Sequence, residues 1–169
     1  RDVADTWLQL AATAGQSAGD PLSYPFTMSP NIESQPHTDL SRLRVGYTED
    51  FGVCEVDDDI RQVFRQKIAR LRGQFACCEE LDLEMDQAHR CFDVLRAEAF
   101  VGSLQKAYEE NPDSLGPNPR ANYEMGAQMS LKECVWASAE QTRIFRRFQQ
   151  LFDRYDIILS PTTPVSAFP

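Results

Sequence analysis

The sequence has few of the residues that build metal or redox centres. It contains two histidines, His37 and His89, and five cysteines. No cysteines form a CxxC pair and neither histidine lies in an HExxH pattern. Adjacent Cys77 and Cys78 would point to opposite faces of a strand and could not share a metal. We therefore expect no metal, no organic cofactor, and buried, reduced thiols as in cytoplasmic proteins. The cysteines are Cys54, Cys77, Cys78, Cys91 and Cys134.

Basic residues and long apolar runs are also scarce. The 169 residues, about one domain of chain, carry 17 Lys and Arg against 26 Asp and Glu, a net charge of −9. That balance is a poor match for nucleic acid or an anionic membrane. No apolar run approaches the roughly 18 residues of a membrane helix, and no signal peptide is expected before Trp7. With 42% hydrophobic residues, the sequence predicts a soluble, acidic, globular protein of the cytoplasm.

Strand and helix patterns alternate along the chain, which predicts an α/β fold. Residues 42–47 and 75–83 read as strands, and residues 57–73 between them as an amphipathic helix with an acidic start. A crossover of this length predicts a βαβ unit with parallel strands. Residues 156–160 form an apolar run typical of a parallel strand buried on both faces. Further helices are predicted at residues 3–14, 89–108 and 131–154.

Two stretches are rich in helix-breaking residues. Residues 15–43 contain Pro21, Pro25, Pro30 and Pro36, which predict an irregular connection within a single partial domain of residues 1–169. Residues 111–122, NPDSLGPNPRAN, are interpreted as a break, followed by a loop around residues 122–128. The chain thus reads as an incomplete α/β domain with a mostly parallel sheet.

The last predicted strand runs directly into SPTTP, residues 160–164. Pro161 and Pro164 restrict the residues before them to extended conformations. In open parallel sheets, ligands bind beyond the carboxyl ends of the strands, where this segment leaves the sheet. The residues alone leave two interpretations open: part of a pocket wall, or a rigid exit from the strand.

No nucleophile stands out from the pattern of residues. His89 and Cys91 are two residues apart on a predicted helix, so their side chains would diverge. Four serines lack an obvious lysine or glycine-loop partner and are interpreted as turn or capping residues: Ser29, Ser34, Ser130 and Ser160.

Four segments in order resemble the amidase signature family. They are RDVADTWLQLAATAGQSAGDPLS at the start, RVGYTEDFG, AEAF, and FQQLFDRYDIILSPTTPVSAFP at the end. The resemblance implies an α/β/α sandwich around a large mixed sheet and hydrolysis of carboxamides, without a cofactor. The family uses a serine nucleophile, a second serine in a cis peptide bond, and a lysine that begins the proton relay. A lysine can act as this base when burial lowers its pKa.

The family's serines and lysine lie in a glycine- and serine-rich stretch, and no GGSSGG-like run occurs in this sequence. The resemblance therefore implies an internal piece of a larger amidase that carries no catalytic residue and is inactive alone. Thr162 and Thr163 are the residues expected to line the substrate pocket. The expected partners are a small-molecule amide and the remaining part of the fold, and a homo-oligomer is left open.

Other hypotheses remain open. The A subunits of tRNA-dependent amidotransferases carry an arginine before the turn that aligns with Gly126; here Asn122 aligns with it and Arg120 lies two residues earlier. This departure favours a stand-alone amidase over an amidotransferase component. The chain could instead be a self-contained α/β binding module without catalysis, for which a monodisperse, cooperatively melting monomer would argue. Acidic residues between Asp57 and Asp86 could also dock a basic partner.

Overall fold

The structure is a computed structural model in which residues 2–83 and 85–167 are described. The chain divides into two compact units, Arg1–Asp39 and Leu40–Pro169. The first contains one α-helix, α1 (Val3–Thr13), as the apolar spacing predicts. The rest of this unit is irregular apart from a short 3₁₀ turn, η1 (Ile32–Ser34).

Within the first unit, α1 is linked to the proline-rich segment by one side chain. The indole Nε1 of Trp7 donates a hydrogen bond to the carbonyl oxygen of Ser29 at 2.8 Å. At its start, the Asp2 carboxylate accepts a hydrogen bond from the Asp5 backbone N–H, which caps the helix. The bond from Trp7 therefore joins the proline-rich segment to α1, although prolines interrupt the backbone hydrogen bonding of that segment.

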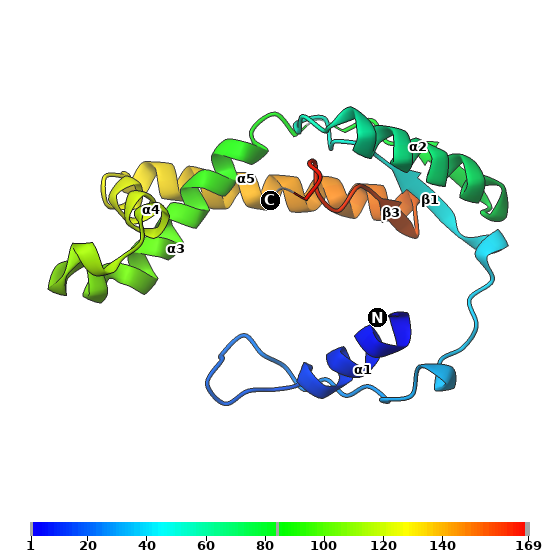
Figure 1. Ribbon diagram of the computed structural model, residues 1–169, viewed down its shortest axis with the longest axis horizontal. Helices are drawn as coiled ribbons and strands as arrows, with labels where there is room; N and C mark the ends of the chain where they lie inside the picture. The colour runs from blue at the N-terminus through cyan, green and yellow to red at the C-terminus, as the bar shows by residue number, and fades with distance from the viewer. Residues whose placement is uncertain (1, 84, 168–169) are drawn as a thin grey trace. The chain divides into compact units, whose positions relative to one another are not determined.

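The second unit contains a three-stranded sheet in the order β2-β1-β3, of which β1 and β3 are labelled in Figure 1. Strand β1 (Arg44–Tyr47) lies in the centre, with β2 (Cys77–Glu80) and β3 (Ile157–Leu159) on either side, and both pairings are parallel. Helix α2 (Asp58–Leu71) connects β1 to β2. The predicted βαβ unit and parallel sheet are therefore confirmed. Short 3₁₀ turns are η2 (Leu40–Arg42), η3 (Arg72–Gln74) and η4 (Pro112–Ser114).

The two faces of the sheet are covered differently. On one face, the fully buried Val45 packs with Ile68 of α2 and Cys78 of β2. On the other face, a β-carbon at Gly46 would overlap the Leu81 side chain and lie only 3.1 Å from the ring of Tyr155. The sheet therefore lies between α2 and the segment at the end of the last helix, as in a layered α/β/α arrangement.

Three further helices pack together beside the sheet: α3 (Ala88–Glu110), α4 (Pro117–Ala127) and α5 (Leu131–Arg154) (Figure 1). Cys91 and Val94 of α3 and Ala137 of α5 form their core. Ser130 begins α5 with a capping box, in which its hydroxyl accepts from the Glu133 N–H and the Glu133 side chain accepts from the Ser130 N–H. The capping role predicted for Ser130 is confirmed. None of the described helices is both long and apolar enough to span a membrane.

The predicted break at residues 111–122 is wrong in its second half, because α4 begins at Pro117 and continues to Ala127. Pro117 occupies the first helical position, where a missing N–H removes no intrahelical hydrogen bond and the fixed φ suits the helix. The prolines therefore start a helix here. Helix α4 also includes residues 122–127, which therefore do not form the loop expected around residues 122–128.

The expectation that β3 is buried on both faces is also wrong for this chain. In the described residues β3 pairs only with β1, and Ile157 is 38% exposed. The cysteines are free, as expected. Cys78 and Cys91 are buried, but the other three, Cys54, Cys77 and Cys134, are only half-buried.

Arg44 and Asp156 join the amino ends of β1 and β3. The guanidinium Nη2 of Arg44 lies 2.8 Å from Asp156 Oδ1, and the Arg44 backbone N–H donates to Oδ2 at 2.8 Å. The hydrogen bonds from Arg44 lower the pKa of Asp156 to about 2. An unfolded aspartate has a pKa of about 3.9, so the ionised carboxylate stabilises the fold above that pH. This contribution is lost as the pH falls from about 4 to about 2.

We therefore expect Asp156→Asn to lower the urea midpoint of the chain at neutral pH. The difference from the unsubstituted chain should shrink through the interval from about pH 4 to about pH 2. Urea titrations followed by circular dichroism at a series of pH values measure it. The nearby, exposed Asp153 provides a control as Asp153→Asn. A difference for Asp156→Asn that stays constant down to about pH 2 would contradict the linkage.

Candidate functional site

Two segments meet beyond the carboxyl ends of β1 and β3: the loop of residues 48–57, and the exit segment, residues 160–164. The Thr48 backbone N–H donates to the Leu159 carbonyl oxygen at 3.0 Å. At the other end of the loop, the Asp57 N–H donates to the Pro164 carbonyl oxygen at 2.9 Å. The loop and the exit segment therefore lie side by side at the edge where open parallel sheets bind ligands.

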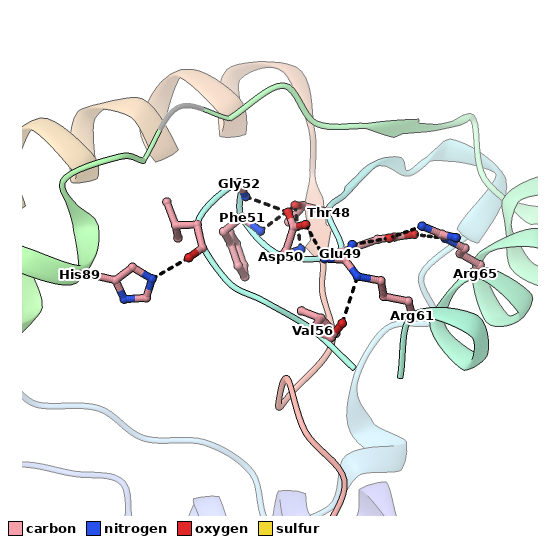
Figure 2. Close-up of polar contacts among 10 residues, drawn as sticks. Thr48, Glu49, Asp50, Phe51, Gly52, Val56, Arg61, Arg65 and His89 are labelled. Atoms are coloured by element: carbon pink, nitrogen blue, oxygen red, sulfur yellow. Dashed lines mark hydrogen bonds and ion pairs between the residues drawn. The ribbon is translucent and has the colours of Figure 1, made fainter. Parts of the chain in front are cut away.

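A tight turn at residues 50–53 shapes the loop (Figure 2). The Val53 N–H donates to the Asp50 carbonyl oxygen at 3.1 Å, and Phe51 and Gly52 have φ values of 55° and 70°. Positive φ at both central residues is the pattern of a type I′ turn. The buried hydroxyl of Thr48 accepts from the Phe51 N–H at 2.9 Å, and the Asp50 carboxylate from the Gly52 N–H at 2.9 Å. Side chains of the loop thus stabilise its strained backbone.

Two arginines of α2 bind the acidic side chains of this loop (Figure 2). Arg65 contacts both carboxylate oxygens of Glu49, at 2.6 and 2.8 Å. Arg61 contacts Glu49 at 2.9 Å, Asp50 at 3.0 Å, and the Val56 carbonyl oxygen at 3.2 Å. This arrangement positions backbone by charge-assisted hydrogen bonds.

Hydrogen bonds fix the charge of both carboxylates. The guanidinium of Arg65 lowers the pKa of Glu49, with Arg61 adding to the effect against the opposing influence of burial. The Gly52 N–H lowers the pKa of Asp50, and Arg61 adds to it. A general acid or base works best with a pKa near the operating pH. Glu49 and Asp50 are therefore suited to structural ion pairing rather than proton transfer.

Helices α3 and α5 also contact the turn. The ring of Phe51 packs against that of Phe148 with centroids 6.3 Å apart, and His89 Nε2 lies 2.6 Å from the Val53 carbonyl oxygen. Cys91 instead directs its thiol to the Ala137 carbonyl oxygen at 3.3 Å. His89 and Cys91 thus contact different segments. This agrees with the prediction that their side chains diverge and do not form a nucleophile pair.

Thr162 and Thr163 lie on the exit segment, and both side chains are exposed. The Thr163 hydroxyl donates to the Val165 carbonyl oxygen at 3.0 Å. Neither threonine lines the cavity of about 360 Å³ nearby, which lies between α2 and the carboxyl ends of β1 and β2. That cavity is lined by Tyr47, Glu49, Phe64, Arg65, Ile68, Ala69, Arg72 and Glu80.

The arginine network was not predicted from the sequence. The available signals were the TEDFG stretch, in which glycine follows acidic residues as in tight turns, and the spacing of Arg61 and Arg65, which places both on one helix face. The lysines of the chain are the residues that could supply the base of a proton relay. The chain has three lysines, Lys67, Lys106 and Lys132, and all are exposed.

The fold and the carboxyl edge of its sheet define the class of protein. It is an α/β protein in which a polar loop and a proline-bounded segment lie at the carboxyl ends of a parallel sheet. A family model described as "Amidase" matches residues 1–169. The chain is 24% identical to an amidase of Pseudomonas putida, over 99% of this chain and 36% of that protein. It is 23% identical to the A subunit of the glutamyl-tRNA(Gln) amidotransferase of Moorella thermoacetica, over 99% of this chain and 39% of that protein.

A solved structure has the same fold. It is a bacterial aryl acylamidase described as belonging to the amidase signature enzymes, with a TM-score of 0.73 and 19% identity. The match covers 92% of this chain and 34% of that one. The chain belongs to the amidase signature family, and it spans 36 to 39% of the length of these two curated relatives.

Proposed function

We propose that this chain is part of an amide hydrolase that cleaves carboxamide C–N bonds through a serine nucleophile. In this proposal the chain supplies the scaffold and one wall of the substrate pocket. The carrying observation is that the exit segment lies against the loop of residues 48–57 at the carboxyl edge of a parallel sheet. Membership of the amidase signature family supplies the reaction class.

We further propose that the serine nucleophile, the second serine and the lysine base are contributed by residues outside this chain, which is inactive alone. A serine hydroxyl is a weak nucleophile until a neighbouring base accepts its proton. A lysine acts as that base when removal from water lowers its pKa. The exposure of all three lysines argues against such a role for any of them.

Thr162 and Thr163 are proposed to line the substrate pocket. Both side chains are exposed, and Pro164 restricts the backbone of Thr163. The Thr163 hydroxyl donates to the Val165 carbonyl oxygen, which fixes its orientation. The Thr162 hydroxyl can donate to a substrate carbonyl or accept from an amide N–H, and the Thr163 hydroxyl, whose proton is donated to Val165, can accept from an amide N–H. This segment can therefore orient an amide group without taking part in bond cleavage.

The test compares the chain alone with the product of the complete reading frame on a broad panel of amides. We expect hydrolysis only from the latter. There, Thr162→Val should raise KM by about three- to tenfold, the effect of one neutral hydrogen bond, with Thr163→Val behaving similarly. Thr142→Val, at an exposed position of α5, is the matched control. Absence of hydrolysis across the panel would overturn the function, and unchanged kinetics in both variants would overturn the pocket assignment.

A second candidate is the A subunit of a tRNA-dependent amidotransferase, because several relatives carry that name. Arg120, near the position where those subunits place an arginine, contacts Glu124 and Asp113, each at 2.9 Å. Asn122 itself donates to the Asn118 carbonyl oxygen at 2.8 Å. Because the nearby guanidinium is engaged by two carboxylates, we favour a stand-alone amidase. Glutamine-dependent ammonia release by the complete protein would reverse this preference.

A further inference from the structure

We propose that Arg61 is a positioning residue, which fixes the exit segment at the carboxyl edge of the sheet through the peptide group that joins Val56 to Asp57. The inference rests on the proposed function only in treating the exit segment as a pocket wall. Its structural content is independent of any reaction.

The guanidinium of Arg61 connects both ends of the loop. Its Nη1 and Nη2 donate to Glu49 and Asp50 at the start of the loop, at 2.9 and 3.0 Å. Its Nε donates to the Val56 carbonyl oxygen near the end of the loop, at 3.2 Å (Figure 2). The Arg61 side chain is 25% exposed and that of Glu49 11%, so these contacts are partly shielded from water. One planar group therefore sets the distance between the two ends of the loop.

The contact with Val56 reaches the exit segment through a single peptide plane. The C=O of Val56 and the N–H of Asp57 belong to the same trans peptide group, so they point in opposite directions. Arg61 donates to that C=O, and the N–H on the other side donates to the Pro164 carbonyl oxygen at 2.9 Å. A donor on the C=O side fixes the orientation of the plane and polarises its N–H. Loss of Arg61 should therefore weaken the bond to Pro164.

Arg65 provides a comparison that distinguishes the positioning role of Arg61 from a general effect of positive charge. It lies one helical turn after Arg61 and binds the same Glu49 carboxylate in a bidentate manner. The bonds to Asp50 and Val56, however, are made by Arg61. Substitution of Arg65 thus removes a comparable positive charge and leaves the contact with the peptide plane in place.

The experiment measures amide hydrogen exchange by NMR in the full chain, in Arg61→Gln, Arg61→Lys and Arg65→Gln. The Leu81 N–H, which donates to the Tyr47 carbonyl oxygen, reports on the sheet. We expect the Asp57 amide to exchange about three- to tenfold faster in both Arg61 variants, with the Leu81 amide unchanged. Lysine keeps the charge but lacks the planar fork, so it should not restore protection. Arg65→Gln should leave the Asp57 amide within about twofold of the original.

Three outcomes would overturn the proposal. Full protection of the Asp57 amide in Arg61→Lys would show that charge alone suffices. Equal acceleration of the Asp57 and Leu81 amides would show that Arg61 acts on global stability. An equal effect of Arg65→Gln would assign the role to Glu49. If Arg61→Gln does not fold, Arg61→Lys provides the same comparison. Because no amide needs to be hydrolysed, failure of the proposed function and failure of this inference are distinguishable.

Discussion

Gly126→Val is expected to lower the free energy of unfolding of the chain by about 3 kcal/mol, the upper end of the usual cost of overpacking a core. Gly126 lies where α4 crosses α3, and a β-carbon there would overlap the Ala97 carbonyl oxygen and approach Val101 Cγ2 within 2.7 Å. Because Ala97 presents backbone, no side-chain rotation can relieve the overlap. The two helices would have to separate, which would also disturb the stacked rings of Tyr108 and Tyr123, 4.1 Å apart.

The matched control for this prediction is Gly102→Val. Gly102 lies within α3, and a β-carbon there would have no neighbour within 4 Å. The same substitution should be neutral or stabilise by a few tenths of a kcal/mol, since valine has a slightly better helix propensity than glycine. Urea denaturation followed by circular dichroism measures both. Similar midpoints for the two variants would show that α3 and α4 are not closely packed.

Gly52→Ala is expected to destabilise the chain by about 2 kcal/mol. Gly52 has a φ of 70°, which costs an alanine about 1 to 2 kcal/mol. In addition, a β-carbon would lie 2.8 Å from the backbone oxygen of Leu83, so that the neighbouring segment would have to move. Both effects act on the turn that packs against Phe148 and presents the acidic side chains to Arg61.

Gly73→Ala is the control for this second substitution, because a β-carbon at Gly73 would have no neighbour within 4 Å. It should change the free energy of unfolding by less than about 0.5 kcal/mol. Thermal and urea unfolding of the two variants measure the difference. If Gly52→Ala is as stable as Gly73→Ala, the left-handed turn at residues 50–53 is not the conformation of the loop in solution.

The sequence predicted those elements whose signal is local and periodic. The apolar spacing predicted α5 with its observed bounds, and the strand–helix–strand pattern predicted the parallel pairing of β1 and β2. Helix α4 was missed because the prolines at its start were interpreted as breakers, although proline in the first turn removes no hydrogen bond.

The site was predicted less well, because its contacts join residues whose proximity has no local signature. Segment 160–164 was expected at the carboxyl edge of the sheet, and it lies there beside Asp57. The roles of Thr162 and Thr163 stay predictions. The contacts of Arg61 could not be predicted, because its three acceptors lie five to twelve residues away in the sequence. The turn at Gly52 brings these acceptors together.

The pairing of Arg44 with Asp156 has a consequence for the time at which the sheet can be completed. The two residues are 112 positions apart in the chain. During synthesis at about 5–20 residues per second, β3 would leave the ribosome on the order of ten seconds after β1. Over that interval the βαβ unit can form from nearby residues, while the other edge of β1 remains open to pairing with a foreign strand. Slowing translation should therefore lower the yield of folded chain, and chaperones that cover strand edges should restore it.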